Sequence, residues 1–267
     1  MKEYEVTDVY GIPSYKAVEL GPRLSSAALV IPVINEGDKL TNQLSKLQSA
    51  GFKVDVIVAD GGSADGSTGI DLLKSQGVRA LVTKVGSGRL SAQLRMAFYW
   101  CQQEDYKYVV TMDGNGKDDI EGVVKILSAL ESGYDFVQGS RFIQDGLAVN
   151  TPKSRLLAIK LLHAPITSLA AGYTFTDSTN GFRGFSLKAL MDERVSILRP
   201  VFDSYELLAY LPIRLARVGF SVTEIPVVRR YPSSGQIPTK IHGLSAHVAL
   251  IKILLRAALG FFNPKKA

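Results

Sequence analysis

The chain has 267 residues, of which 46% are hydrophobic and 21% are charged, so it is long enough to bury a sizeable core. Its formal net charge of +6 favours anionic partners, but the basic residues are dispersed rather than gathered into runs, which argues against nucleic-acid binding. The single cysteine, Cys101, excludes an internal disulfide and a thiolate cluster for zinc. The N-terminus lacks the apolar stretch of a secretory signal, so we expect a cytoplasmic protein.

Strands and helices are predicted to alternate through the first half of the chain. Continuous apolar runs are typical of strands buried on both faces, and segments with helical spacing follow them. The alternation predicts an α/β fold with a doubly wound, mainly parallel sheet. We expect strands at residues 27–34, 54–59, 80–84, 108–112, 135–140 and 222–228, and helices at residues 38–50, 69–76, 91–104, 120–132 and 205–218.

Polar loops fall where four of these strands end. They contain Asn35 and Glu36, residues 60–67, residues 113–119 and residues 139–141. Ligands of doubly wound sheets bind outside the carboxyl ends of the strands, so we expect these loops to form one site.

The loop at residues 113–119 is the most informative of the four, because an apolar strand ends there in oxygen ligands separated by glycines. Its sequence is Asp113-Gly-Asn115-Gly-Lys117-Asp118-Asp119. Such oxygens suit Mg²⁺ or Mn²⁺, which often complete their shell with the phosphates of a nucleotide. An acidic turn that merely ends a strand has the same composition, and the loop alone leaves both interpretations open.

Other common site patterns do not match this sequence. A dinucleotide-binding Gly-x-Gly-x-x-Gly would have to follow the first predicted buried strand, where Asn35-Glu36-Gly37-Asp38 stands. There is no Walker loop or nucleophile elbow, and three scattered histidines disfavour a metallohydrolase.

Several motifs follow one another in a fixed order. They are Ile31-Pro-Val-Ile-Asn-Glu36, Ala59-Asp60-Gly-Gly-Ser63-Ala-Asp65-Gly-Ser67, Gly88-Arg-Leu-Ser-Ala-Gln-Leu-Arg95, the loop at residues 113–119, Gln138-Gly-Ser-Arg141, Asp177-Ser-Thr-Asn-Gly-Phe-Arg183 and Glu224-Ile-Pro-Val-Val-Arg-Arg230. Together they resemble the inverting family 2 glycosyltransferases of the GT-A fold, in particular the dolichyl- or polyprenyl-phosphate mannosyl- and glucosyltransferases. The resemblance implies transfer of a hexose from a nucleotide diphosphate sugar to a polyprenyl phosphate.

The resemblance also implies roles for single residues. Those implied to bind the nucleotide are Pro32, Asn35, Glu36, Asp60, Gly88, Arg89, Asp113 and Asn115. Those implied to act in catalysis are Asp113, Arg141, Arg155, Asp177 and Arg230, with the arginines facing the acceptor's phosphate. Asp113 and Asn115 are implied to hold Mg²⁺ or Mn²⁺.

The sequence departs from the family pattern in the same loop. Asn115 replaces a second acid, and Lys117 stands where a glutamine ligand is common. The ion then needs Asp118 or Asp119, or Lys117 itself neutralises part of the diphosphate charge. A catalytically weakened protein that only binds a nucleotide sugar is therefore one alternative. Another is transfer to a saccharide hydroxyl, which would need a carboxylate base such as Asp177 or Asp118.

Two apolar segments, residues 156–171 and 244–262, carry charged residues and do not have the composition of membrane spans. We expect a transferase domain at residues 1–243 and an amphipathic helix at residues 244–267. That helix would either lie peripherally on the inner face of a membrane or pack on the body or in a homodimer. We favour packing over chemistry for His163, a lone histidine on an apolar helix, and we also favour a role outside the chemistry for Lys117 and His242.

Overall fold

The structure is a computed structural model that describes residues 1–7, 9–233 and 243–265. His242 therefore lies outside the described residues. The strands are β1 (Lys2–Val6), β2 (Tyr15–Glu19), β3 (Ala27–Val33), β4 (Asp55–Asp60), β5 (Val78–Lys84), β6 (Tyr108–Thr111), β7 (Phe136–Ser140), β8 (Leu147–Val149), β9 (Arg183–Ser186), β10 (Val222–Pro226) and β11 (Val228–Arg230). The helices are α1 (Asp38–Ala50), α2 (Ile70–Ser75), α3 (Leu90–Gln103), α4 (Gly122–Glu131), α5 (Lys153–Ala158), the π-helical turn η1 (Ile159–His163), α6 (Ala164–Ala171), α7 (Leu187–Leu190), α8 (Glu206–Arg217) and α9 (Gly243–Ala258).

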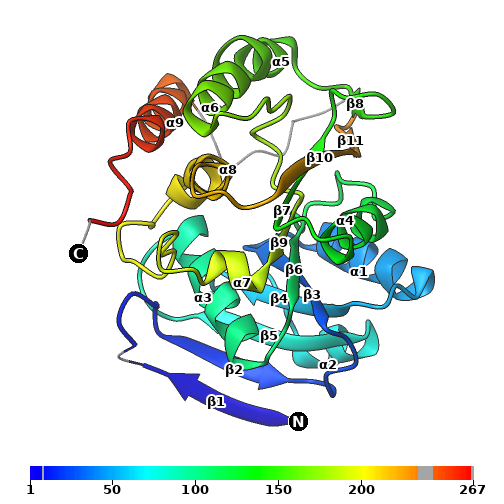
Figure 1. The fold of residues 1–267 in the computed structure, drawn as a ribbon. Helices are drawn as coiled ribbons and strands as arrows, with labels where there is room; N and C mark the ends of the chain where they lie inside the picture. Colours follow the sequence, from blue (N-terminus) through cyan, green and yellow to red (C-terminus); the bar gives the residue numbers. More distant parts are fainter. Residues whose placement is uncertain (8, 234–242, 266–267) are drawn as a thin grey trace.

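A mixed sheet runs through the middle of the molecule (Figure 1). Its strand order among the described residues is β1-β2-β5-β4-β3-β6-β9-β7-β10. The block β5-β4-β3-β6 is parallel throughout, so the polar loops after β3, β4 and β6 meet at one edge. The predicted fold class is confirmed.

The sheet differs from the sequence prediction at its margins. The hairpin of β1 and β2 was not identified, and neither was β9, which lies antiparallel between β6 and β7. β9 is short and contains Gly184, where a Cβ would lie 2.2 Å from Ile126 Cγ2, so this strand gains little from strand propensity and depends on close packing under α4. The strand expected at residues 222–228 is divided into β10 and β11, and β11 pairs with β8 in a separate two-stranded sheet.

The two faces of the sheet bury alternate residues of the parallel strands. Ala28 and Val30 of β3 belong to one hydrophobic cluster, together with residues of α3, α7 and α8. Leu29 and Ile31 belong to a second cluster on the opposite face, together with residues of α1, α2 and α4. Both faces are therefore dry, which explains why these strands are continuous apolar runs in the sequence.

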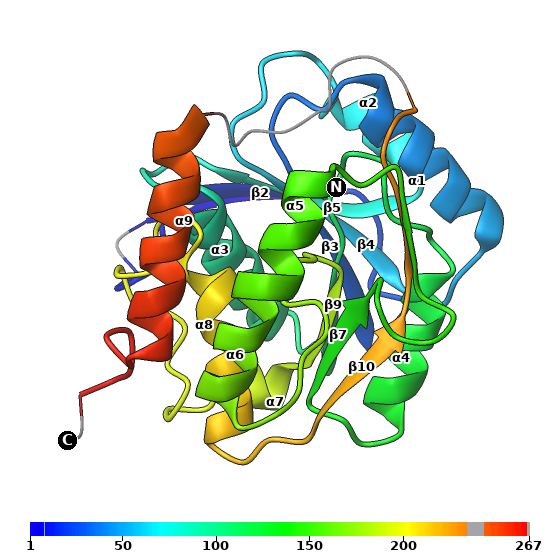
Figure 2. The same cartoon turned by 90° about the horizontal axis from the view of Figure 1, so that it is seen from above.

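The C-terminal helices form an outer group on the α8 side. The segment α5-η1-α6 and helix α9 run side by side, and both α6 and α9 contact α8 (Figure 2). Leu254 and Ala257 of α9 are buried, and so is Phe262 after it, whose ring packs against Phe202. Among the described residues, none of the helices has the length and apolar character needed to cross a membrane.

Candidate active site

The loops after β3 and β4 are tied to each other at the carboxyl edge of the sheet. Asn35 has a positive φ of 51°, and its Oδ1 accepts a hydrogen bond from the Ala64 amide at 2.8 Å. The amide of Gly37 donates to Asp65 Oδ2 at 2.9 Å. This pairing holds Glu36, which is half-buried, beside the second loop.

Asp60 and Gln93 hold the carboxyl ends of β3 and β4 in place through hydrogen bonds. Asp60 is 2% exposed, and its Oδ1 accepts hydrogen bonds from the amide and the hydroxyl of Ser63 at 2.9 and 2.7 Å. Gln93 of α3 donates to the carbonyl oxygens of Val33 and Ala59 at 2.9 and 2.5 Å. Asp60, which was predicted to bind the nucleotide, therefore also stabilises the turn, and its role toward a ligand stays a prediction.

The start of α3 is bonded to the segment before α8. The amides of Arg89 and Ser91 donate to the carbonyl oxygens of Asp203 and Ser204 at 2.9 and 2.7 Å. Gly88 has a φ of +99°, and a Cβ there would lie 2.5 Å from Ala92 Cβ, so the turn requires glycine. These two amides at the start of α3 therefore already donate to protein carbonyl oxygens. The exposed side chain of Arg89 remains available to a ligand.

Asp113 lies at the end of β6, in contact with Arg229, a residue that is not among the predicted site residues. Arg229 Nη2 donates to Asp113 Oδ2 at 2.8 Å, and Asn115 Nδ2 donates to the same oxygen at 3.3 Å. The side chain of Asp113 is 33% exposed. Burial alone would raise the pKa of Asp113, but the Arg229 guanidinium and Lys117 hold it below its usual value, so Asp113 is a carboxylate at neutral pH.

Arg229 also binds the second acid of the loop. Its Nη1 donates to Asp118 Oδ2, and the Asp118 side chain is fully buried. Asn180 Oδ1 lies 3.4 Å from the same nitrogen. Burial alone would lower the pKa of Arg229, but the two carboxylates hold it well above its usual range. Arg229 is therefore a permanent cation between Asp113 and Asp118.

Arg141 and Asp177 form a second buried ion pair. Arg141 Nε and Nη2 donate to the two carboxylate oxygens of Asp177 at 2.6 and 2.8 Å, and both residues are at most 4% exposed. Glu224 of β10 accepts hydrogen bonds from the amides of Thr176 and Asp177 at 2.9 and 3.1 Å. The two predicted catalytic residues thus hold each other, and their direct contact with substrate stays a prediction.

The loop that carries Asp177 is secured from the other side by Arg183. Its guanidinium donates to the carbonyl oxygens of Ser178, Asn180 and Leu208 at 2.8, 3.0 and 2.8 Å. Burial lowers the pKa of Arg183 to about 10. Because Arg183 is buried and donates to three carbonyl oxygens, we assign it a structural role.

Three cations surround the ring of Tyr231. Lys117 Nζ and the Cζ atoms of Arg155 and Arg229 lie 5.1, 5.6 and 5.9 Å from the ring centroid. Arg155 Nη1 also donates to the Tyr231 hydroxyl at 2.8 Å. Burial alone would raise the pKa of Tyr231, but Arg229 and Arg155 bring it below its usual value. The predicted Arg155 therefore lies with Lys117 and Arg229 around Tyr231, and Arg229 of this group contacts Asp113.

Arg230 is not part of this group. Its side chain is exposed, whereas the neighbouring Arg229 is 6% exposed and contacts both acids. Adjacent residues of a strand point to opposite faces, so the register of β11 decides which of the two arginines turns inward. Of the two, the structure places Arg229 rather than Arg230 against the acidic loop, and the motif spacing could not have distinguished them.

The donor set at this loop fits a divalent ion only in part. Asp113 and Asn115 offer oxygens of the right kind. Oδ2 of Asp113, however, already accepts hydrogen bonds from Arg229 and Asn115, and Asp118 is buried against Arg229. Within the described part of the chain, no group of three or more His, Cys, Asp or Glu side chains could hold a metal. The residues thus fit an ion that enters with a nucleotide's phosphates, but not one held by protein oxygens alone.

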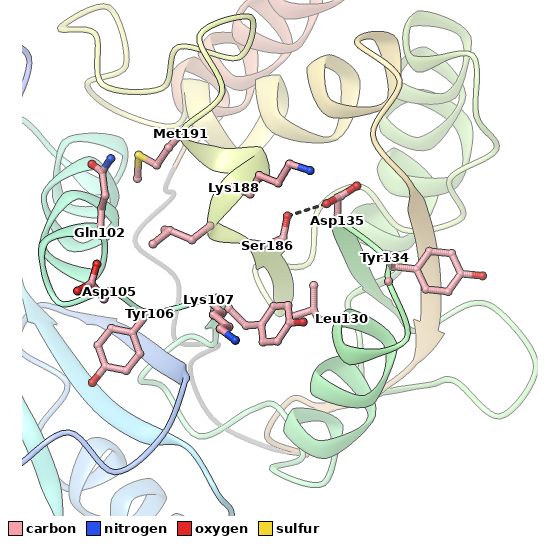
Figure 3. Close-up of a pocket in the computed structure, with 13 residues that line it drawn as sticks. Gln102, Asp105, Tyr106, Lys107, Leu130, Tyr134, Asp135, Ser186, Lys188 and Met191 are labelled. Atoms are coloured by element: carbon pink, nitrogen blue, oxygen red, sulfur yellow. Dashed lines mark hydrogen bonds between the residues drawn. The ribbon is translucent and has the colours of Figure 1, made fainter.

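Cavities lie at the two ends of β6. One of about 20 Å³ touches Pro32, Asp113 and Gly181 at the candidate site. A larger hollow of about 550 Å³ lies at the opposite end of β6 and is lined by Lys107, Lys188 and Tyr134 among others (Figure 3). Asp135 in that hollow binds the Ser186 hydroxyl at 2.8 Å and the Ser221 amide at 3.2 Å, so its carboxylate ties neighbouring segments together. The larger hollow therefore lies at the other end of β6 from the loop that carries Asp113.

Comparison with solved structures identifies the fold. Glucosyl-3-phosphoglycerate synthase from Mycobacterium tuberculosis, in a complex with Mn²⁺, UDP-glucose and phosphoglyceric acid, has a TM-score of 0.60 at 16% identity and covers 90% of this chain and 81% of that chain. The same enzyme in complex with Mg²⁺ and UDP has a TM-score of 0.57 at 16% identity, over 90% of this chain and 80% of that one. The molecule has the GT-A fold of nucleotide-sugar-dependent transferases.

Comparison of sequences gives the family. The sequence model of the family described as glycosyl transferase family 2 matches residues 28–193 of the chain. The chain therefore belongs to this family of glycosyltransferases. The polyprenol monophosphomannose synthase of Mycolicibacterium smegmatis is 26% identical over 228 residues, which cover 84% of each protein. The undecaprenyl-phosphate mannosyltransferase of Micrococcus luteus is 28% identical over 207 residues, which cover 74% of this chain and 81% of that protein.

Proposed function

We propose that the protein is an inverting hexosyltransferase that uses a nucleotide diphosphate sugar as donor and a polyprenyl phosphate as acceptor. A phosphate oxygen of the acceptor forms a bond to the anomeric carbon. The bond from that carbon to the donor's diphosphate breaks, and its electron pair leaves with the diphosphate. The names of the two relatives above support this acceptor class.

One observation favours a phosphate acceptor over a hydroxyl acceptor. The carboxylates considered as general bases are both occupied: Asp177 is bound by Arg141, and Asp118 is bound by Arg229. Neither side chain is accessible to solvent. A phosphate is already an anion near neutral pH and does not need such a base, whereas a hydroxyl does.

The cations around Tyr231 suit a reaction in which an anionic acceptor binds and an anionic diphosphate leaves. Lys117, Arg155 and Arg229 gather around Tyr231, and preorganised cations stabilise the charge that develops on a leaving diphosphate. In this proposal Asp113 and Asn115 hold Mg²⁺ or Mn²⁺ against the diphosphate, and the ion supplies Lewis-acid stabilisation of the leaving group. The metals in the solved complexes of the M. tuberculosis enzyme support such use in this fold.

A donor and acceptor panel tests the proposed reaction. The full chain is incubated with labelled GDP- and UDP-sugars and with either undecaprenyl or dolichyl phosphate, and the label is extracted into organic solvent. We expect a lipid-extractable sugar with at least one donor. Donor hydrolysis without any lipid product would contradict the acceptor class. Nucleotide-sugar binding with no turnover on any acceptor would instead favour the catalytically weakened alternative.

We further propose that the outer surface of α5-η1-α6 and α9 lies on a membrane. Leu157, Leu161 and Leu169 of the first segment are 57, 73 and 83% exposed. Leu259 and Phe261 after α9 are 74 and 67% exposed, the Arg256 guanidinium lies over the Phe261 ring, and Lys252 and Arg256 are exposed on α9. Exposed leucines beside basic residues suit the headgroup region of an anionic bilayer. Packing in a homodimer is the alternative use of this surface.

Flotation with anionic vesicles tests the membrane surface. The double variant Leu161→Gln with Leu259→Gln is expected to bind vesicles about a hundredfold more weakly or worse, because burying each leucine contributes about 1.5–3 kcal/mol. Leu24→Gln is the matched control, since Leu24 is 84% exposed and lies in the loop before β3. A chain ending at residue 243 is less informative, because Leu254 and Phe262 are buried against the body.

Two results would remove the membrane role. One is equal flotation of the double variant and the Leu24→Gln control, and the other is no flotation of the wild type. Size-exclusion chromatography with light scattering on the same proteins would then decide between packing and dimerisation. The division into a domain at residues 1–243 and a helix at residues 244–267 stays part of this proposal.

A further inference from the structure

Arg229 lies between two carboxylates of the loop that was predicted to hold a metal ion. Its two terminal nitrogens contact Asp113 and Asp118, one acid each. Its side chain is 8% exposed. A cation of fixed charge therefore already compensates the acids of the loop that most resembles a metal site.

The backbone keeps Arg229 in this position. Residue 229 forms an antiparallel bridge with residue 118, and the flanking hydrogen bonds run from the Arg230 amide to the Lys117 carbonyl at 2.8 Å and from the Asp119 amide to the Val228 carbonyl at 3.0 Å. On its other side, β11 pairs with β8. Withdrawing the guanidinium would break contacts that the strand pairing holds in place, so we treat it as a fixed part of the site.

The charges explain the unusual composition of the loop. Arg229 between Asp113 and Asp118 compensates the two carboxylates. Position 115 then carries a neutral Asn and adds no further negative charge to attract a divalent ion. Lys117 adds a second positive charge in the same loop, and its Nζ lies 5.1 Å from the centroid of the Tyr231 ring, which Arg229 also contacts. A divalent ion approaching Asp113 would meet the positive charge of Arg229, whereas a diphosphate would be attracted.

We propose that Arg229 is the resident cation of this site, so that a nucleoside diphosphate binds without any divalent ion and an ion enters only together with the diphosphate. The inference rests on the proposed function, because it concerns the donor site of that reaction. Arg229 acts through Asp113 and the loop charge, and it is a positioning residue. Its removal should uncover a metal site that the wild type does not display.

Two binding measurements on the full chain test this inference. Isothermal titration calorimetry with UDP and with GDP is run in EDTA and again in Mn²⁺. Titration of Mn²⁺ alone is followed by electron paramagnetic resonance. The wild type is expected to bind one of the nucleotides in EDTA with a Kd less than about tenfold weaker than in Mn²⁺, a change of 1.4 kcal/mol. It is expected to bind no Mn²⁺ in the absence of nucleotide.

Arg229→Gln is expected to reverse both results. Nucleotide binding in EDTA should fall by about tenfold or more and return with Mn²⁺, because an uncompensated Asp113 and Asp118 now attract the ion. Mn²⁺ alone should bind this variant. Since Arg229→Gln leaves the buried Asp118 unpaired, the double variant Arg229→Gln with Asp118→Asn keeps the measurement possible if the single variant does not fold. It should also lose nucleotide binding in EDTA.

Arg79→Gln is the matched control. Arg79 is likewise a buried arginine held between two carboxylates, those of Glu104 at 2.5 Å and Glu19 at 3.6 Å, and its side chain is 6% exposed. It lies on β5 and not in the acidic loop, so its removal should leave the metal dependence of nucleotide binding unchanged. The same reversal in Arg79→Gln would overturn the inference.

The remaining outcomes separate this inference from the proposed function. If the wild type binds nucleotide only with Mn²⁺, or binds Mn²⁺ alone, the role of Arg229 is wrong and the transferase proposal stands. If neither UDP nor GDP binds under either condition, the donor site itself is wrong and both proposals fall.

Discussion

Asp113→Ala is expected to lower the rate of sugar transfer by about a hundredfold or more, the scale on which a single preorganised electrostatic contact contributes to catalysis. Of the two acids that Arg229 joins, Asp113 is the one whose side chain is partly exposed, at 33%, and can face a ligand. Its loss removes the carboxylate that would hold an ion against the diphosphate. It also removes one of the two contacts that fix Arg229. Initial rates with the donor identified by the panel measure the effect.

The control for Asp113→Ala is Asp71→Ala, which removes an exposed acid from the first turn of α2. This variant should retain the wild-type rate. Thermal unfolding of both variants should show whether a lost rate reflects a lost fold. Normal turnover by a folded Asp113→Ala, together with a rate that does not change on chelation, would show that the metal prediction is wrong and that the loop's cations carry the leaving-group charge.

Asp177→Asn is expected to produce the largest loss of stability, about 3–5 kcal/mol, because removing one partner of a buried ion pair leaves the other charge uncompensated. Asp177 is fully buried, and it accepts both short hydrogen bonds of the Arg141 guanidinium. Urea unfolding followed by circular dichroism measures the change in the free energy of unfolding.

The exposed pair of Arg194 and Asp192 provides the comparison. Their Nε and Oδ1 atoms lie 2.9 Å apart, but the two side chains are 58 and 24% exposed. Asp192→Asn should therefore cost much less than Asp177→Asn, since solvent screens this pair. Equal losses in the two variants would contradict the structural role assigned to Asp177. A stable but inactive Asp177→Asn would instead indicate that Asp177 takes part directly in catalysis.

The sequence by itself determined the central parallel block and the edge on which the site lies. β3, β4, β5 and β6 are buried on both faces along most of their length, so each has a continuous apolar stretch, and that pattern is visible in the sequence alone. Asn35, Asp60 and Asp113 lie where β3, β4 and β6 end and the loops begin, because the chain leaves the core there. Those features are local, and the ordered motifs built on them identified the family.

The tertiary structure alone decided which charged residues meet. Arg229 and Asp113 are 116 residues apart, and only the pairing of β11 beside the acidic loop turns Arg229, rather than the predicted Arg230, toward Asp113 and Asp118. Arg141 and Asp177 could both be selected from motifs, but not as partners of each other. The register of β11 sets the contacts of Arg229, and a shift of one residue would reverse the direction of every side chain in that strand. For that reason the sequence could supply the candidate residues, whereas their pairing needed the fold.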